Sequence, residues 1–163
     1  MAMKITSTAF REGSEIPVQH TCDGPDISPP LSWTGVPAEA KSLMLTVKDP
    51  DAPSGTFIHW VLYNLPPDLG GLPEDTPVDK ELENGAVQCS NGFGRMGYGG
   101  PCPPPGDEAH RYLFDLYALD VELSLPNELS EADINREIKD HILADGHLMG
   151  KYQRDQAKAA DTR

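Results

Sequence analysis

The chain has 163 residues, a length that fits a single domain with a substantial buried core. Lys and Arg number 13 against 26 Asp and Glu, so the formal net charge is −13 at pH 7. A net charge of that sign repels the phosphate backbone of nucleic acids and the surface of anionic bilayers. The composition therefore argues against a nucleic-acid partner and against stable membrane association.

The start of the chain and its apolar runs bear on location. Residues 1–6 lack the apolar stretch of about 7–15 residues that a secretory signal contains, and nowhere do about 18 apolar residues follow one another. We therefore expect a soluble, cytoplasmic protein. One domain is expected over residues 1–154, followed by a frayed polar tail over 155–163.

Short apolar runs separated by proline and glycine dominate the chain. It contains 16 prolines and 15 glycines, and this spacing favours many short strands over long helices. Three runs have a clear strand pattern, at residues 43–49, 57–64 and 110–119. The body of the protein is therefore predicted to be mainly β.

Alternation of side chains along these strands places the candidate functional groups. His110 and Tyr112 should project from the same face of their strand. By the same rule, His59 should share its face with Val61 and Tyr63. Both histidines lie near the starts of their strands, where loops form the rim of a site.

The C-terminal part of the chain has the only helical pattern. Ser130 is a suitable N-cap with Asp133 three residues later, and isoleucines recur every fourth residue at 134, 138 and 142. This helix is expected to end at Asp145–Gly146. A second short helix is expected from His147 to about residue 153.

The segment from Ser90 to Ala109 has no strand or helix pattern. Within it, Gly92–Gly97 matches GxGxxG, but prolines follow where a dinucleotide-binding loop needs a helix. Glycines that permit positive φ in an irregular loop are the simpler interpretation. Loops of this length are functional or disordered, and the proline content favours an ordered, functional loop.

Carboxylates and imidazoles suggest a metal site as one alternative. Asp49, Asp51, His59 and His110 have the residue types that bind divalent cations. However, Pro50 separates the two aspartates rigidly, and the HxH and HExxH spacings are absent. In the more ordinary arrangement, one carboxylate orients a histidine and the other caps the turn.

The cysteines offer little covalent chemistry. Cys22, Cys89 and Cys102 are odd in number and form no CxxC pair, so neither a disulfide framework nor a structural zinc site is expected. Cys102 lies between prolines, without the helix N-terminus that commonly lowers a thiol pKa. The ordinary interpretation of Cys102 is a small buried residue in the wall of a pocket. The alternative is a thiol that nearby histidines activate.

Anion binding is the interpretation that uses these residues together. His59, His110 and Tyr112 can donate hydrogen bonds to a phosphate or carboxylate, as can free N–H groups of the glycine-rich loop. Asp49 can accept from an attached ammonium group. This set suits a zwitterionic head group. Because histidines titrate near pH 6.5, anion affinity is expected to rise as the pH falls.

Three motifs carry a resemblance to a known family. DPDAP followed by HW lies within Asp49–Trp60, and GPCPPPG followed by HRY lies within Gly100–Tyr112. TCDG followed by SPPLSW and GVP lies within Thr21–Pro37. Together they resemble the phosphatidylethanolamine-binding protein family, also called the Raf kinase inhibitor protein family. The likeness covers about residues 4–152 and is strongest to the bacterial and archaeal branch.

That resemblance implies a Greek-key β-sandwich with a large central sheet, a smaller sheet on one side and C-terminal helices on the other. It also implies a small, solvent-open pocket for phosphate, acetate or phosphorylethanolamine. Family members act by binding, as modulators of kinases or proteases, so no catalytic residue, metal or cofactor is expected. The implied ligand-binding residues are Asp49, Asp51, His59, Cys102, Pro104, His110 and Tyr112.

Two alternatives from other functional classes are kept. A hydrolase would use Asp49 or His59 as a general base, with Cys102 or a metal as the reactive centre. A protease-inhibitor module would insert a surface loop into a protease cleft, and Ser90–Ala109 is the candidate loop. The oligomeric state is left open, a homodimer included.

Overall fold

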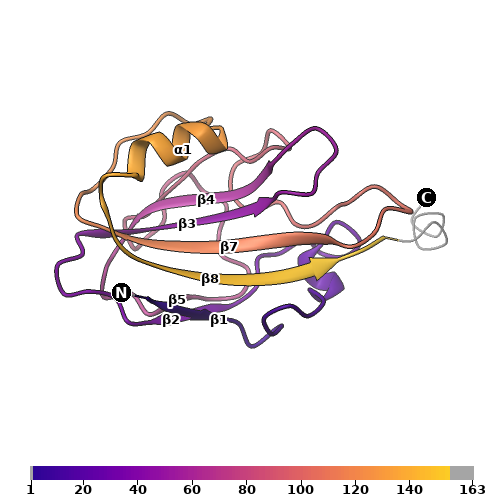
Figure 1. The fold of residues 1–163 in the computed structure, drawn as a ribbon, viewed down its shortest axis with the longest axis horizontal. Helices are drawn as coiled ribbons and strands as arrows, with labels where there is room; N and C mark the ends of the chain where they lie inside the picture. The colour runs from indigo at the N-terminus through magenta and orange to yellow at the C-terminus, as the bar shows by residue number, and fades with distance from the viewer. Residues whose placement is uncertain (1, 155–163) are drawn as a thin grey trace.

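Two antiparallel sheets and one short α-helix make up the described chain, residues 2–154 of the computed structural model (Figure 1). The larger sheet has the strand order β6-β4-β3-β7-β8 and the smaller sheet the order β1-β2-β5. The larger sheet comprises β6 (Val87–Gln88), β4 (Phe57–Leu65), β3 (Ser42–Asp49), β7 (His110–Leu119) and β8 (Ile142–Tyr152). The remaining elements are β1 (Lys4–Thr6), β2 (Leu31–Thr34), β5 (Gly71–Leu72), the 3₁₀ turn η1 (Val18–His20) and α1 (Glu131–Ile138).

The larger sheet is covered on both faces. Figure 1 shows α1 against one face and the smaller sheet against the other. All eight residues of β3 are buried, as expected for a strand at the centre of a covered sheet. The core between the sheets includes Ile5, Trp33, Leu45, Trp60, Phe114 and Leu148, and the core under α1 includes Met44, Val61, Tyr63, Ile134 and Ile138. The mainly β sandwich predicted from the sequence is therefore confirmed.

The helix begins where the sequence predicts. The Ser130 side chain accepts from the backbone N–H of Asp133, and the Asp133 carboxylate accepts from the backbone N–H of Ser130, so the capping box is complete. The helix ends at Ile138 rather than at residue 145, and Ile142 lies in a strand. Within residues 2–154, no helix has the length and apolar character needed to cross a membrane.

The predicted second helix from His147 is wrong, because this segment belongs to β8. β8 pairs with β7 along its whole length, from Ile142 opposite Leu119 to Tyr152 opposite His110. Its buried positions alternate strictly, but two of them are Gly146 and Gly150, so hydrophobicity alone does not reveal the period of two. The frayed tail that the sequence predicts over 155–163 lies outside the described residues.

A β-bulge in β4 determines where His59 points. Trp60 pairs with Val47, whereas Ile58 pairs with Lys48, so His59 is the extra residue between two register positions. Bulges commonly re-aim a side chain at the end of a strand. Here the bulge lets His59 join the side of the sheet that carries Trp60, which is the side facing the smaller sheet.

The predicted face of His59 is therefore wrong. Val61 and Tyr63 pack in the core under α1, on the other side of the sheet. His59 instead lies beside Tyr112, with ring centroids 5.2 Å apart. Strict alternation from residue 57 fails here because it does not allow for an inserted residue.

The cysteine prediction is also wrong. Cys22 and Cys102 form a disulfide with a Cα–Cα distance of 5.4 Å, and Cys89 is a buried free thiol. Counting cysteines does not find this bridge, because the two residues lie 80 positions apart in irregular segments. The bond joins the loop after η1 to the long loop before β7.

Candidate functional site

A cavity of about 260 Å³ lies where the ends of three strands of the larger sheet meet their loops. β3 ends at Asp49, β4 begins at Phe57 and β7 begins at His110, so residues distant in sequence converge there. Larger hollows lie elsewhere, such as one of about 480 Å³ beside Gly13–Glu15, but neither His59 nor His110 lines them. The lining residues are Asp49, Ala52, Pro53, Ser54, Phe57, His59, Phe93, Cys102, Pro103, Pro104, His110 and Tyr112.

His110 is held between two carboxylates. Its Nδ1 lies 2.7 Å from Oδ2 of Asp49, and its Nε2 lies 3.1 Å from Oδ2 of Asp107. Burial lowers the pKa of His110, but the hydrogen bonds to Asp49 and Asp107 outweigh that effect, so the pKa lies above its usual value. The pKa shift favours the imidazolium, which donates from both nitrogens.

Asp49 also fixes the turn that follows β3. Its Oδ1 accepts a 2.8 Å hydrogen bond from the backbone N–H of Asp51, the arrangement of an Asx turn. One carboxylate therefore both orients His110 and closes the Pro50 turn. The sequence predicted that one carboxylate orients a histidine and the other caps the turn, whereas in the structure Asp49 does both.

Asp51 faces away from the cavity. It accepts from the backbone N–H of Arg111 at 2.9 Å and from the guanidinium at 3.0 and 2.9 Å. The side-chain hydrogen bonds from Arg111 lower the pKa of Asp51 to about 2. Asp51 thus joins the β3 turn to the start of β7, and the four residues of the predicted metal site do not converge.

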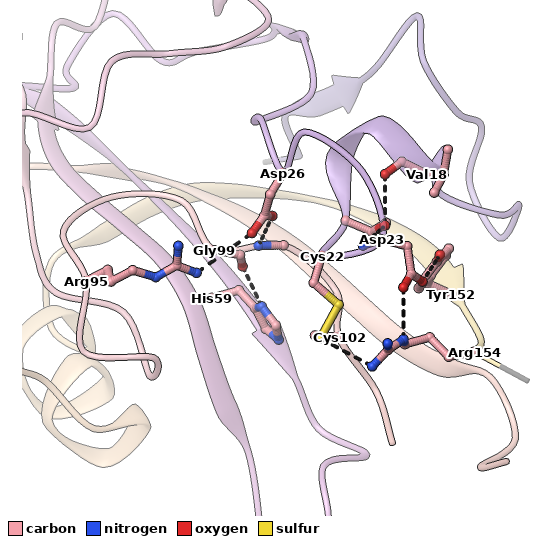
Figure 2. The surroundings of a disulfide bond; sticks show 12 residues. Val18, Cys22, Asp23, Asp26, His59, Arg95, Gly99, Cys102, Tyr152 and Arg154 are labelled. Atoms are coloured by element: carbon pink, nitrogen blue, oxygen red, sulfur yellow. Dashed lines mark hydrogen bonds and ion pairs between the residues drawn. A yellow bond between two sulfur atoms is a disulfide. The ribbon is translucent and has the colours of Figure 1, made fainter. Parts of the chain in front are cut away.

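His59 is buried in the neutral form. Burial lowers its pKa below the usual value. Its Nδ1 lies 2.6 Å from the carbonyl oxygen of Gly99, as Figure 2 shows, and a carbonyl can only accept, so Nδ1 carries the proton. Nε2 then has a free lone pair and makes no hydrogen bond with the described residues. At neutral pH, His59 therefore offers the cavity an acceptor rather than the donor that the sequence suggested.

Tyr112 supplies an unpaired donor. Its side chain is buried, and within the described chain its hydroxyl has no hydrogen-bond partner. Burial raises its pKa, as do the charge of the nearby Asp49 carboxylate and its side-chain interaction with the hydroxyl, which falls short of hydrogen-bond geometry, so the hydroxyl stays protonated at neutral pH. A buried polar atom without a partner costs roughly 1–3 kcal/mol. Of the buried unpaired side-chain atoms among the described residues, this is the one that belongs to a residue lining the cavity.

Two phenylalanines form the remaining aromatic wall. The ring centroids of Phe57 and Phe93 are 4.7 Å apart, and both rings contact His59. A Cβ on Gly92 would lie 2.6 Å from the Phe57 ring, and one on Gly99 would lie 2.6 Å from the Phe93 ring. The glycine-rich loop therefore permits close ring packing, in addition to the positive φ of Gly94 and Gly97 that the sequence suggested.

The family model described as phosphatidylethanolamine-binding protein matches residues 6–153. The chain belongs to the phosphatidylethanolamine-binding protein family. A UPF0098 protein of Methanothermobacter thermautotrophicus is 49% identical over 152 residues, which cover 93% of this chain and 99% of that relative.

Solved structures agree with membership of the family. The homologue from Chlamydia trachomatis, titled as a phosphatidylethanolamine-binding protein homologue, has a TM-score of 0.82 and 45% identity, covering 94% of this chain and 99% of its own. YbcL of Escherichia coli has a TM-score of 0.86 and 34% identity, with the same coverage of both chains. A carboxypeptidase Y inhibitor, solved with its cognate proteinase, shares the fold alone, at a TM-score of 0.59 and 17% identity.

Most of the predicted site of this phosphatidylethanolamine-binding family member comes together. Of the predicted ligand-binding residues, all but Asp51 line the cavity. The sequence analysis did not find Phe57 and Phe93. The available sequence signal for Phe93 was a phenylalanine between two glycines, Gly92 and Gly94. Cys102 lines the cavity as half of a disulfide rather than as a thiol.

Proposed function

We propose that the cavity binds a small zwitterionic head group with a phosphoryl or carboxyl anion at one end and an ammonium at the other. The unpaired Tyr112 hydroxyl carries this proposal, because it is a buried donor in a wall that also holds the free acceptor of His59. A ligand that both accepts and donates would satisfy both groups.

The anion would lie between Tyr112 and His110. The Tyr112 hydroxyl is free to donate, and the raised pKa of His110 favours the charged imidazolium. Both nitrogens of His110 already face carboxylates, so the anion would take the place of Asp107 at Nε2. Asp107 is the replaceable partner, since its side chain is 43% exposed whereas that of Asp49 is 4% exposed.

The ammonium would lie among the acceptors and aromatic rings. Asp49 carries the negative charge of the wall, and Nε2 of His59 can accept from an N–H group. The ring of Phe57 offers a π face that attracts cations, and the Phe93 ring already has the Arg95 guanidinium 5.4 Å from its centroid. Lysine and arginine do not occur among the described lining residues, so a ligand with its own cation suits the cavity better than a bare anion.

Family membership supports the same ligand class. The matching family model takes its description from phosphatidylethanolamine, whose head group joins a phosphate to an ammonium. A phosphoryl group on a kinase or protease would present the anionic half of this chemistry, so modulation of such a partner remains a prediction from the resemblance. We expect affinities between about 10 μM and 1 mM, because the net charge of −13 opposes anions.

We propose binding rather than catalysis as the activity. The hydrolase alternative used the Cys102 thiol or a bound metal as its reactive centre, and in the disulfide the Cys102 sulfur is not a nucleophile. In a soluble cytoplasmic protein, which the sequence suggests, the ligand would be a water-soluble head group or a phosphorylated partner. The protease-inhibitor alternative, with Ser90–Ala109 as its loop, stays a prediction from the sequence.

Calorimetry tests the proposal directly. Phosphorylethanolamine, inorganic phosphate and ethanolamine are titrated into the parent protein and into the His110→Ala variant at pH 6 and pH 8. We expect phosphorylethanolamine to bind more tightly than either half, and the variant to lose about tenfold or more in affinity. Equal affinity in parent and variant, or no binding of any of the three compounds, would refute the proposed function.

A further inference from the structure

The disulfide forms part of the cavity wall. Figure 2 shows Cys22 bonded to Cys102, and Cys102 lines the cavity together with the two prolines that follow it. Neither cysteine belongs to a strand or helix. The bond therefore fixes a loop of the binding site to the loop after η1, rather than stabilising the core of the sandwich.

The two loops are also joined without the disulfide. The Tyr98 hydroxyl donates to the carbonyl of His20 at 2.6 Å, and the N–H of Gly100 donates to Oδ1 of Asp26 at 2.8 Å. The N–H of Cys22 donates to the carbonyl of Pro101 at 3.1 Å. These contacts hold the chain up to residue 101, so breaking the bond would leave the sandwich folded. After residue 101, the disulfide holds the wall residues that follow Cys102, namely Pro103 and Pro104.

The surroundings of Cys102 favour exchange of the bond with an external thiol. Both cysteines are half-buried, so a small thiol can reach them. Nη1 of Arg154 lies 3.6 Å from Sγ of Cys102, and Nε of Arg154 is anchored on Asp23 at 3.1 Å. A guanidinium beside a sulfur stabilises the thiolate, which makes Cys102 the better leaving group.

We propose that the Cys22–Cys102 disulfide is a redox latch on the ligand cavity, opened by a dithiol reductant. A reductant thiolate attacks Sγ of Cys22, the S–S bond breaks, and its electron pair stays on Cys102 beside Arg154. The second reductant thiol then displaces Cys22. The protein gains two electrons and two protons, and the reductant becomes a disulfide.

Opening the latch weakens ligand binding through the wall. Pro103 and Pro104 follow Cys102 directly and line the cavity, so their positions depend on the bond at one end. At the other end, the N–H of Gly106 donates to the carbonyl of Arg154 at 2.8 Å. In a reducing cytoplasm the thiol pool acts on this half-buried bond, whereas an oxidising compartment keeps it closed. The effect on affinity rests on the proposed function, but the movement of the wall does not.

The test compares oxidised protein with protein reduced by dithiothreitol at pH 7.5. Mass spectrometry verifies a gain of two hydrogens, and circular dichroism verifies that the fold persists. Residues 103–105 are prolines without an N–H, so the readout is the exchange at Gly106 and Asp107, whose N–H groups donate to the carbonyls of Arg154 and Pro104. Their exchange is expected to accelerate about tenfold or more, and exchange in β3 and β7 is expected to stay unchanged. Phosphorylethanolamine affinity is expected to fall about tenfold and to return on reoxidation.

Variants separate the latch from general effects. The Cys22→Ser and Cys102→Ser double variant should behave as the reduced protein, and Cys89→Ser should behave as the parent because Cys89 is buried elsewhere. Arg154→Gln should slow reduction about three- to tenfold, and Lys151→Gln, also near the C-terminal end of β8, should not.

Failure of the latch and failure of the proposed function give different results. Unchanged exchange at Gly106 and Asp107 after complete reduction would overturn the latch, as would unfolding on reduction or a reduced protein that binds as tightly as the oxidised one. If neither redox form binds phosphorylethanolamine, the proposed function fails, and the exchange data alone decide whether the wall is released.

Discussion

His59 and Tyr112 stand edge to face in the wall of the cavity, with ring centroids 5.2 Å apart and ring planes at 80°. They come from different strands, and only the bulge in β4 turns His59 to the side of Tyr112. The first offers a free lone pair and the second a free hydroxyl proton. A ligand that both donates and accepts hydrogen bonds, as the proposed function requires, would satisfy both groups.

Removing the Tyr112 hydroxyl should separate binding from stability. We expect Tyr112→Phe to weaken phosphorylethanolamine binding about five- to tenfold, because one donor is lost. The free energy of unfolding should stay within about 0.5 kcal/mol of the parent or rise, since the hydroxyl has no protein partner to lose. Calorimetry and urea unfolding measure the two effects.

Tyr98→Phe is the matched control for stability. The Tyr98 hydroxyl is also buried, but it donates to the carbonyl of His20 at 2.6 Å. Its loss should destabilise the protein by about 1–2 kcal/mol. If Tyr112→Phe destabilises as much as Tyr98→Phe, the Tyr112 hydroxyl has a partner in the free protein and our description of the site is wrong.

Asp107 should compete with anionic ligands for His110. The Asp107 carboxylate lies 3.1 Å from Nε2 of His110 and is 43% exposed, so it occupies the position that an external anion needs. We expect Asp107→Asn to raise affinity for phosphate about three- to tenfold and to lower the pKa of His110. Glu108→Gln makes the same change of charge next door and should do neither. Unchanged affinity in the Asp107 variant would show that the ligand does not use Nε2.

The two cavity histidines should titrate on opposite sides of the usual value near 6.5. Burial lowers the pKa of His59, whereas carboxylate hydrogen bonds, opposed by burial, raise that of His110. Nitrogen NMR of the imidazoles measures both, and should also find the His59 proton on Nδ1. Titration in the reverse order would contradict the burial of His59 or the carboxylate pairing of His110.

Stability should respond to pH with two signs. The His110 contribution is complete below about pH 6.5 and is lost as the pH rises through its raised folded pKa. For His59, the unfolded chain binds the proton first, so stability falls as the pH drops from about 6.5 through its lowered folded pKa. Urea unfolding of His59→Asn should therefore show less loss of stability than the parent between pH 6.5 and 5. An equal loss would assign the acid effect to other groups.

The sequence predicted the parts of the site that depend on local pattern. The strand over 110–119 and the capping box at Ser130 follow from alternation and from residue spacing, and both are present. The proline-rich turns at Asp49 and before His110 do converge on one cavity. For the strand and the capping box the signal lies within about ten residues, the range over which periodicity and capping act. The meeting of the two turns, 61 residues apart at Asp49 and His110, was implied by the family resemblance instead.

Features that depend on distant contacts were not predictable in this way. The disulfide joins residues 80 positions apart, and nothing near either cysteine indicates the partner. The bulge at His59 depends on the pairing of β4 with β3, whose register shifts by one residue between Trp60 and Ile58. β8 was mistaken for a helix because glycines fill two of its buried positions. Glycine in a strand indicates a close approach of another segment, which only the fold supplies.

The buried glycines of β8 give a direct test of how this strand packs. A Cβ on Gly146 would lie 2.7 Å from the carbonyl oxygen of Met3, a backbone atom that cannot rotate away. We expect Gly146→Ala to destabilise the protein by about 1–3 kcal/mol, because β8 or the N-terminal segment must shift. Gly70→Ala is the control, since a Cβ there meets nothing within 4 Å and should change stability by less than about 1 kcal/mol. Urea unfolding measures both, and equal effects would show that the N-terminal segment does not pack on β8 as described.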